Sequence, residues 1–207
     1  YLSKSTPIID MGCGLGDYIH HLAEKGFEVY GFDGTPNIDE CSIYHPVLEA
    51  DLTEPLSQQL EIPKGNVISL EVGEHIPQNY ESQLLDNLTE YCLDTLILSW
   101  AIPNQGGHGH FNEQPNVYII ERVEERGLEY DELSTSQFRT ELAELINHNP
   151  VDGPWSFFLN TIMIFKRKKI PCFEFGSLAE LDSELGELEN ANVYIASLYN
   201  WGNPSDE

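Results

Sequence analysis

The chain has 207 residues and a formal net charge of −25, because 35 Asp and Glu residues oppose 10 Lys and Arg residues. This length suits one domain with a sizeable core, and so acidic a surface argues against nucleic-acid and membrane partners. Cys13, Cys41, Cys92 and Cys172 show no C-x-x-C spacing, and no apolar run is long enough for a membrane span. We therefore expect reduced thiols and a cytoplasmic protein.

A glycine-rich turn lies close to the N-terminus. The apolar pair Ile8-Ile9 predicts a buried strand, and three glycines then alternate with other residues from Asp10 to Gly16. Glycine permits a tight turn and lets a ligand lie against the backbone. We expect a helix from Asp17 to Lys25, whose free N–H groups point back at that ligand. The stretch therefore predicts a small-molecule site.

The spacing of the glycines separates two classes of ligand. A dinucleotide fold favours G-x-G-x-x-G, whereas this chain has G-x-G-x-G with Asp17 in the place of the last glycine. A carboxylate there repels a pyrophosphate and suits the amino group of an amino-acid ligand. The form D-x-G-C-G-x-G resembles the first motif of the class I S-adenosylmethionine-dependent methyltransferases. The resemblance implies a doubly wound, mostly parallel, seven-stranded α/β sheet that binds S-adenosylmethionine.

Acidic residues end the next two predicted strands. The segment Glu28 to Asp33 alternates as a strand does, and a carboxylate at its end is placed to accept ribose hydroxyls. The segment Pro46 to Leu52 is typical of a third strand. The resemblance to the methyltransferases implies a set of cofactor-binding residues, namely Asp10, Gly12, Gly14, Gly16, Asp33, Gly34, Asp51, Leu52 and Glu71.

Strands and helices alternate along the rest of the chain, which is typical of a doubly wound sheet. The further strands are expected in the stretch Asn66 to Pro77, which leaves the core into a polar loop, and at Thr95 to Ala101 and Trp155 to Phe165, with an extended segment at Leu128 to Thr135. The further helices are expected at Asn79 to Cys92, Asn116 to Arg126 and, capped by Ser136, up to His148.

Two parts of the chain are expected, the first from the resemblance to the methyltransferases and the second from its composition. Residues 1–170 would form the methyltransferase domain, and the acidic, leucine-bearing residues 171–207 would pack on it or link it to another domain. The family usually carries helical material before its first strand. Because this chain starts at Tyr1, close to its first strand, we expect it to be part of a longer multidomain polypeptide.

Three histidines follow the fourth and fifth predicted strands, whose carboxyl ends border the ligand crevice in open α/β sheets. Histidine is the side chain whose pKa best suits proton removal near neutral pH. We expect His75 or His108 to be the general base for a hydroxyl acceptor. Glu74, Gln105 and His110 are expected to bind that acceptor.

The segment Glu71 to His75 also resembles the E-x-x-E-H segment of many small-molecule methyltransferases, including ubiquinone-pathway O-methyltransferases. Some of these relatives use it to bind a divalent metal that carries the substrate oxygens. In others, which have no metal, the His only lines the pocket. The resemblance therefore implies Glu71, Glu74 and His75 as candidate ligands for Mg²⁺ or Mn²⁺.

The loop W-A-x-P-x-Q-x-G-H-G-H, from Trp100 to His110, resembles loops of methyltransferase domains that accompany glycosyltransferases. This implies O-methylation of a small polyhydroxylated acceptor, such as a sugar residue of a glycan. Two alternatives stay open: N-methylation of a small amine, and a methyltransferase-like subunit that binds a partner protein without catalysis. A nicotinamide-dependent reductase is not expected.

Overall fold

The computed structural model describes residues 2–42, 46–148 and 154–168. The predicted C-terminal extension and Cys172 lie outside the described residues. Residues 1–168 group into one compact unit, and Cys13, Cys41 and Cys92 within it are free thiols. Among the described helices, none combines the length and the apolar character needed to cross a bilayer.

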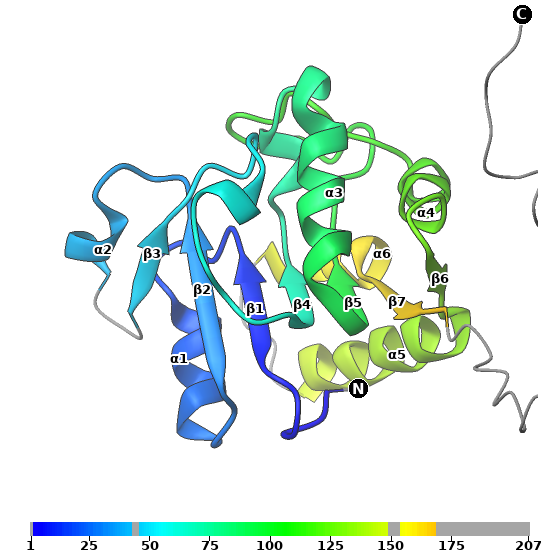
Figure 1. The fold of residues 1–207 in the computed structure, drawn as a ribbon. Helices are drawn as coiled ribbons and strands as arrows, with labels where there is room; N and C mark the ends of the chain where they lie inside the picture. Colours follow the sequence, from blue (N-terminus) through cyan, green and yellow to red (C-terminus); the bar gives the residue numbers. More distant parts are fainter. Residues whose placement is uncertain (1, 43–45, 149–153, 169–207) are drawn as a thin grey trace, which may run out of the picture. The chain divides into compact units, whose positions relative to one another are not determined.

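Seven strands of the described chain form one mixed sheet in the order β3-β2-β1-β4-β5-β7-β6 (Figure 1). They are β1 (Ile8–Met11), β2 (Val29–Asp33), β3 (Val47–Glu49), β4 (Gly65–Ser69), β5 (Cys92–Leu98), β6 (Leu128–Tyr130) and β7 (Met163–Arg167). The strands β1 to β5 run parallel to one another, whereas β7 runs antiparallel to both β5 and β6. This confirms the predicted mostly parallel, seven-stranded, doubly wound sheet.

Helices cover both faces of the sheet. One face carries α3 (Glu81–Tyr91) and α4 (Asn116–Glu124). The other carries α1 (Asp17–Glu24), α2 (Ile38–Cys41), α5 (Glu132–His148) and α6 (Phe158–Thr161). Four short 3₁₀ turns complete the described elements, η1 (Leu56–Gln58), η2 (Gly73–His75), η3 (Gln78–Tyr80) and η4 (Pro154–Phe157).

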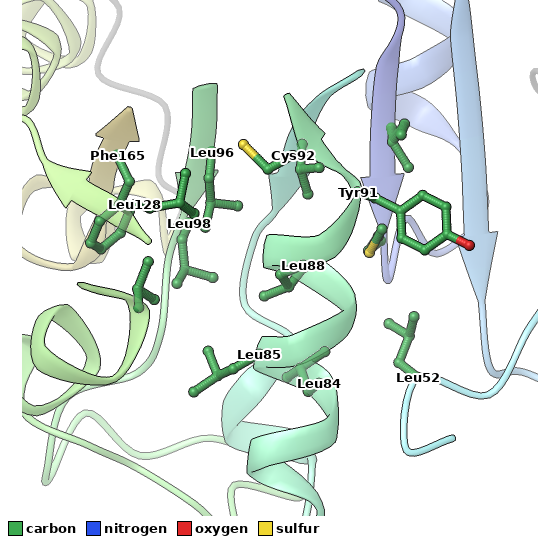
Figure 2. Close-up of a cluster of buried hydrophobic side chains, with 14 of the residues drawn as sticks. Leu52, Leu84, Leu85, Leu88, Tyr91, Cys92, Leu96, Leu98, Leu128 and Phe165 are labelled. Atoms are coloured by element: carbon green, nitrogen blue, oxygen red, sulfur yellow. The ribbon is translucent and has the colours of Figure 1, made fainter. Parts of the chain in front are cut away.

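Side-chain alternation divides the core into two layers. Successive strand residues point to opposite faces, so Ile8 packs under α1 while Ile9 packs under α3. Figure 2 shows the α3 layer, with three leucines of that helix between Leu52 and the side chains of β5, β6 and β7. The leucines are Leu84, Leu85 and Leu88, all fully buried. The strands are thus held rigidly, and their carboxyl ends bring the loops after β1, β2, β4 and β5 to one edge.

The start of α5 corrects one prediction. The extended segment predicted to run from Leu128 to Thr135 ends at Tyr130. Ser136, which we predicted to cap the helix, lies inside it. Asp131 is the cap, because its Oδ1 accepts a hydrogen bond from the Ser134 N–H at 2.9 Å. Thr135 is buried in the first turn, where its hydroxyl oxygen accepts the Ile164 N–H. A β-branched residue such as Thr135 is therefore compatible with the first turn of this helix as well as with the extended segment that we predicted.

The last strand begins later than predicted. It starts at Met163, and the residues from Pro154 to Thr161 form η4 and α6 instead. A short run of aromatic and apolar residues fits a buried helical turn as well as a strand. Phe158 and Ile162 are buried on the α1 side of the sheet, so burial, and not β structure, explains the apolar run.

Replacing Gly31 with Ala tests how closely α1 lies on β2. A Cβ at Gly31 would stand 2.4 Å from Ile19 Cδ1 and 2.9 Å from Cys13 Sγ, both buried side chains. Because overpacking a filled core costs about 1–3 kcal/mol, we expect Gly31→Ala to lower the free energy of unfolding in urea by that amount. Gly34→Ala is the control, since its Cβ would make an ordinary 3.6 Å contact with Ala50 O. Equal losses in both variants would contradict the close packing.

Candidate cofactor and acceptor site

The glycine turn after β1 needs its glycines for conformation and for space. Gly12, Gly14 and Gly16 have φ values of 84°, 55° and 93°, a region that L side chains rarely adopt. A Cβ at Gly12 would also lie 2.4 Å from Val72 Cγ2. The Gly12 N–H donates to Phe32 O at 2.8 Å, which ties the turn to the end of β2.

Asp33 holds the turn from the side of β2. Its Oδ2 accepts the Gly14 N–H at 2.8 Å, and its Oδ1 accepts the N–H and hydroxyl of Thr35 at 2.9 and 2.6 Å. Asp51 repeats this arrangement after β3, because its Oδ1 accepts the N–H and hydroxyl of Thr53 at 2.8 and 2.7 Å. Two D-x-T turns therefore fix two carboxylates beside the glycine turn.

Asp10 lies in β1 directly before the turn. It is 1% exposed, and its Oδ2 has no hydrogen-bond partner among the described residues. Burial, and then the nearby charge of Asp33, raise the pKa of Asp10 to about 7. A buried carboxylate is costly unless it is protonated or paired, so this position suits a cationic group of a ligand.

A cleft of about 650 Å³ opens at this edge of the sheet, a size typical of small-molecule sites. Six of the predicted cofactor-binding residues line it, Gly12, Asp33, Gly34, Asp51, Leu52 and Glu71. Its other lining residues are Thr35, Pro36, Thr53, Val72, His75, Ile76 and Pro77. The three remaining predicted cofactor residues, Asp10, Gly14 and Gly16, belong to β1 and the turn and do not line the cleft. A similar-sized hollow around Lys64 and Arg167 lies at the other ends of β4 and β5, far from this chemistry.

Glu71 joins the loops after β4 and β5. It has a φ of 55°, rare for a residue other than glycine. Its N–H donates to Ser99 Oγ at 2.7 Å, while its carboxylate accepts the Ser99 hydroxyl at 2.8 Å and the Gln105 amide at 2.9 Å. Gln105, predicted to bind the acceptor, is thus engaged by Glu71. These bonds hold the strained backbone in place.

A buried core contact sets the position of the next turn. A Cβ at Gly73 would stand 2.2 Å from the ring of Trp100, which is fully buried, so only glycine lets η2 lie on this ring. The Trp100 indole N–H donates to Asn112 O at 2.6 Å. The Asn112 amide in turn donates to Glu81 at 2.8 Å, and the Tyr118 hydroxyl donates to the same carboxylate at 2.7 Å. The sequence pattern gave no signal for these supporting residues.

Three predicted acceptor-site residues meet where these loops join. One oxygen of Glu74 and one ring nitrogen each of His75 and His110 all lie within 4.8 Å of one another. Glu74 is fully buried, and neither of its carboxylate oxygens has a hydrogen-bond partner among the described residues. Burial, with a smaller contribution from the charge of Glu71, raises the pKa of Glu74 to about 8, while the nearby backbone N–H groups of Glu74 and Ala101 act in the opposite direction without forming full hydrogen bonds.

The two histidines of this group are oriented by neighbours. His75 Nδ1 lies 3.1 Å from Gly109 O, and His110 Nδ1 lies 3.3 Å from Glu113 Oε1. The rings meet edge to face with centroids 4.9 Å apart. Glu113 also accepts the N–H groups of Asn104 and Gly106, each at 2.8 Å, so it organises the loop that carries His110.

The remaining predicted base stands apart from this group. His108 is exposed in the same loop and does not line the cleft, whereas His75 does. Among the described residues, the group with ligand spacing contains His110 in place of the predicted Glu71. The structure thus brings together Glu74, His75 and His110 and leaves His108 outside.

Comparisons with known proteins bear on the fold. Neither the protein-family models nor the curated proteins contain a match to the sequence. Solved structures match: the magnesium protoporphyrin IX methyltransferase ChlM from Synechocystis PCC 6803, with bound SAM, has a TM-score of 0.52 and 22% identity over 78% of this chain and 70% of that one.

Two further structures extend this likeness. A SAM-dependent methyltransferase from Archaeoglobus fulgidus has a TM-score of 0.54 and 18% identity over 78% of this chain and 86% of that one. The sugar N-methyltransferase KedS8 from Streptoalloteichus sp ATCC 53650 has a TM-score of 0.54 and 12% identity over 78% and 80%. The chain therefore has the Rossmann-like fold of the class I S-adenosylmethionine-dependent methyltransferases, as the glycine motif predicts.

The pH dependence of stability tests the burial of Asp10. Because its pKa is raised from 3.8 to about 7, the folded state keeps a proton that the unfolded state loses as the pH rises. This lowers stability progressively between about pH 4 and 7, by up to about 4 kcal/mol. We expect Asp10→Asn to be more stable than the parent at pH 7 and to lose this advantage towards pH 4, as measured by urea unfolding. A difference that does not change with pH would contradict the raised pKa.

Proposed function

We propose that the protein is an S-adenosylmethionine-dependent O-methyltransferase that acts on a hydroxyl of a small polyhydroxylated acceptor, such as a sugar residue of a glycan. The observation that carries the proposal is the cleft lined by Gly12 and Asp33 and by His75. One side of this cleft has the groups that a nucleoside and an amino acid need, and the other has groups that can activate a hydroxyl.

The cofactor side follows from the chemistry of S-adenosylmethionine. Asp33 supplies carboxylate oxygens to the ribose hydroxyls, and Asp51 with Leu52 borders the adenine. Asp10, buried directly before the glycine turn, favours the ammonium group of the methionine end when it is ionised, because a nearby cation stabilises its buried charge. Solved neighbours of the same fold include one with bound SAM and one with bound SAH, which supports this cofactor.

The acceptor side must orient an oxygen in line with the sulfonium methyl group and remove its proton. As the new O–C bond forms, the S–C bond breaks and its electron pair stays on sulfur, which gives S-adenosylhomocysteine and a methyl ether. The hydroxyl proton must leave to a base or to water. His75 lines the cleft beside buried Glu74 and His110, so this group is the activating element of the proposed reaction.

N-methylation of a small amine is the second candidate. Asp33, Asp51 and Glu71 line the cleft, and such negative groups attract a cation. A sugar N-methyltransferase is among the structures of the same fold. A neutral amine needs no proton removed before attack, so this reaction depends less on His75.

Variants at the two ends of the cleft test the proposal. Asp33→Ala loses charge-assisted hydrogen bonds, and we expect the Kd for S-adenosylmethionine to rise at least about 10-fold in calorimetry. His75→Ala loses the activating group, and we expect kcat to fall at least about 100-fold, with Kd for S-adenosylmethionine within about 2-fold of the parent. Full turnover in His75→Ala, with loss of turnover in His108→Ala, would assign activation of the hydroxyl to His108 instead.

A panel of acceptors distinguishes the two reactions. We expect S-adenosylhomocysteine to form with glycosides and other polyols, and the methylated product to be an ether by mass spectrometry. The rate should rise with pH, since removal of the hydroxyl proton is part of the reaction. Turnover with matched amino sugars and none with the parent sugars would favour N-methylation. Binding of S-adenosylmethionine without turnover on any acceptor would favour a non-catalytic subunit.

A further inference from the structure

We infer that Glu74, His75 and His110 bind one divalent transition-metal ion, such as Zn²⁺, Co²⁺ or Mn²⁺, at the acceptor end of the cleft. This inference rests on the proposed function for its role in catalysis, but not for its geometry. The three side chains come from η2 and from the loop after β5, and their ligand atoms lie within 4.8 Å of one another. Ligands about 2 Å from a common metal are separated by distances below this limit.

The two imidazoles have the orientation that metal ligands need. In each ring Nδ1 faces an oxygen acceptor, Gly109 O for His75 and Glu113 Oε1 for His110. A neutral ring that donates from Nδ1 carries its free lone pair on Nε2. No described residue provides a partner for either Nε2. Metal-binding histidines commonly have such a carbonyl or carboxylate behind them, which fixes the tautomer and raises the basicity of the ring.

The environment of Glu74 is independent evidence for a bound cation. It is fully buried, and both of its oxygens lack a hydrogen-bond partner among the described residues. A polar group in that position normally has a partner, because its desolvation is otherwise uncompensated. The two rings beside it are not charged partners when both present a lone pair. A cation between the three side chains satisfies the carboxylate and both nitrogens together.

The donor set decides the kind of ion. Two imidazoles and one carboxylate suit first-row transition ions, whereas Mg²⁺ prefers oxygen ligands and retains water. Glu71 is a poorer third ligand than His110, because its two oxygens already accept hydrogen bonds from Ser99 and Gln105. This differs from the set Glu71, Glu74 and His75 predicted from the sequence.

Three protein ligands leave coordination positions open, as in catalytic metal sites. His75 lines the cleft, so an open position can face the acceptor. A hydroxyl that coordinates the ion has a lowered pKa and a fixed direction, and its proton can then leave to water in the open cleft. Within the proposed function, Glu74, His75 and His110 would hold the ion, and the ion would supply the Lewis acidity that makes the acceptor hydroxyl easier to deprotonate.

Titration of tag-free, metal-stripped protein with Co²⁺ or Zn²⁺ tests the site without cofactor or acceptor. We expect one equivalent to bind in calorimetry, visible absorption of the Co²⁺ complex typical of mixed nitrogen and oxygen ligands, and far weaker binding of Mg²⁺. Glu74→Gln and His110→Gln should each weaken binding at least about 10-fold. His108→Gln, an exposed histidine of the same loop, is the matched control and should bind as the parent does.

Other outcomes overturn the inference. Equal loss in His108→Gln and His110→Gln would indicate loose binding by the loop, and loss in Glu71→Gln with none in His110→Gln would favour the other ligand set. If His110→Gln does not fold, Glu74→Gln alone decides, since unchanged affinity in that variant excludes the site. Absence of metal binding with His75-dependent methyl transfer would leave the proposed function intact, whereas metal binding without methyl transfer to any hydroxyl would contradict the proposed function alone.

Discussion

The connection between the loops after β4 and β5 is the constraint on which the candidate acceptor site depends. Ser99 both accepts the Glu71 N–H and donates to its carboxylate, and Gln105 binds the other oxygen. These part-buried hydrogen bonds keep Glu71 at a positive φ, a conformation that costs of order 1 kcal/mol or more. The backbone consequently turns sharply after β4 and directs Glu74 inward and His75 towards the cleft.

Rigid packing below the loops supports this geometry. Gly73 lies against the buried ring of Trp100, and the indole N–H reaches Asn112 in the same loop that carries His110. The carboxylate of Glu81 then links this loop to α3 and α4. A loop with several glycines would by itself sample many conformations. Here hydrogen bonds within the loop and to Glu81 of α3 restrict it, so His110 is carried by a loop that is fixed to the core.

Local patterns in the sequence predicted the features that depend on neighbouring residues. Strand and helix order follow from periodicity, and the positions of Asp33 and Asp51 follow from where strands end. The segment from Pro154 to Thr161 was not predictable in this way, because an apolar run does not distinguish a buried helical turn from a strand. The meeting of Glu74 with His110 depends on contacts between two distant loops, which no local pattern records. The hydrogen bonds of Glu71 are likewise absent from any local pattern, since its partners Ser99 and Gln105 follow another strand.

The hydrogen bonds that Asp33 already accepts have a consequence for how a ligand binds. A carboxylate offers about four lone-pair positions, and Gly14 and Thr35 already use three of them. One position remains for a diol that presents two donors. Full engagement of both hydroxyls therefore requires the protein to release one of its own hydrogen bonds. Binding of the diol and the conformation of the glycine turn are therefore thermodynamically linked through this carboxylate. The affinity of the cleft for such a ligand depends on how strongly Asp33 holds the turn.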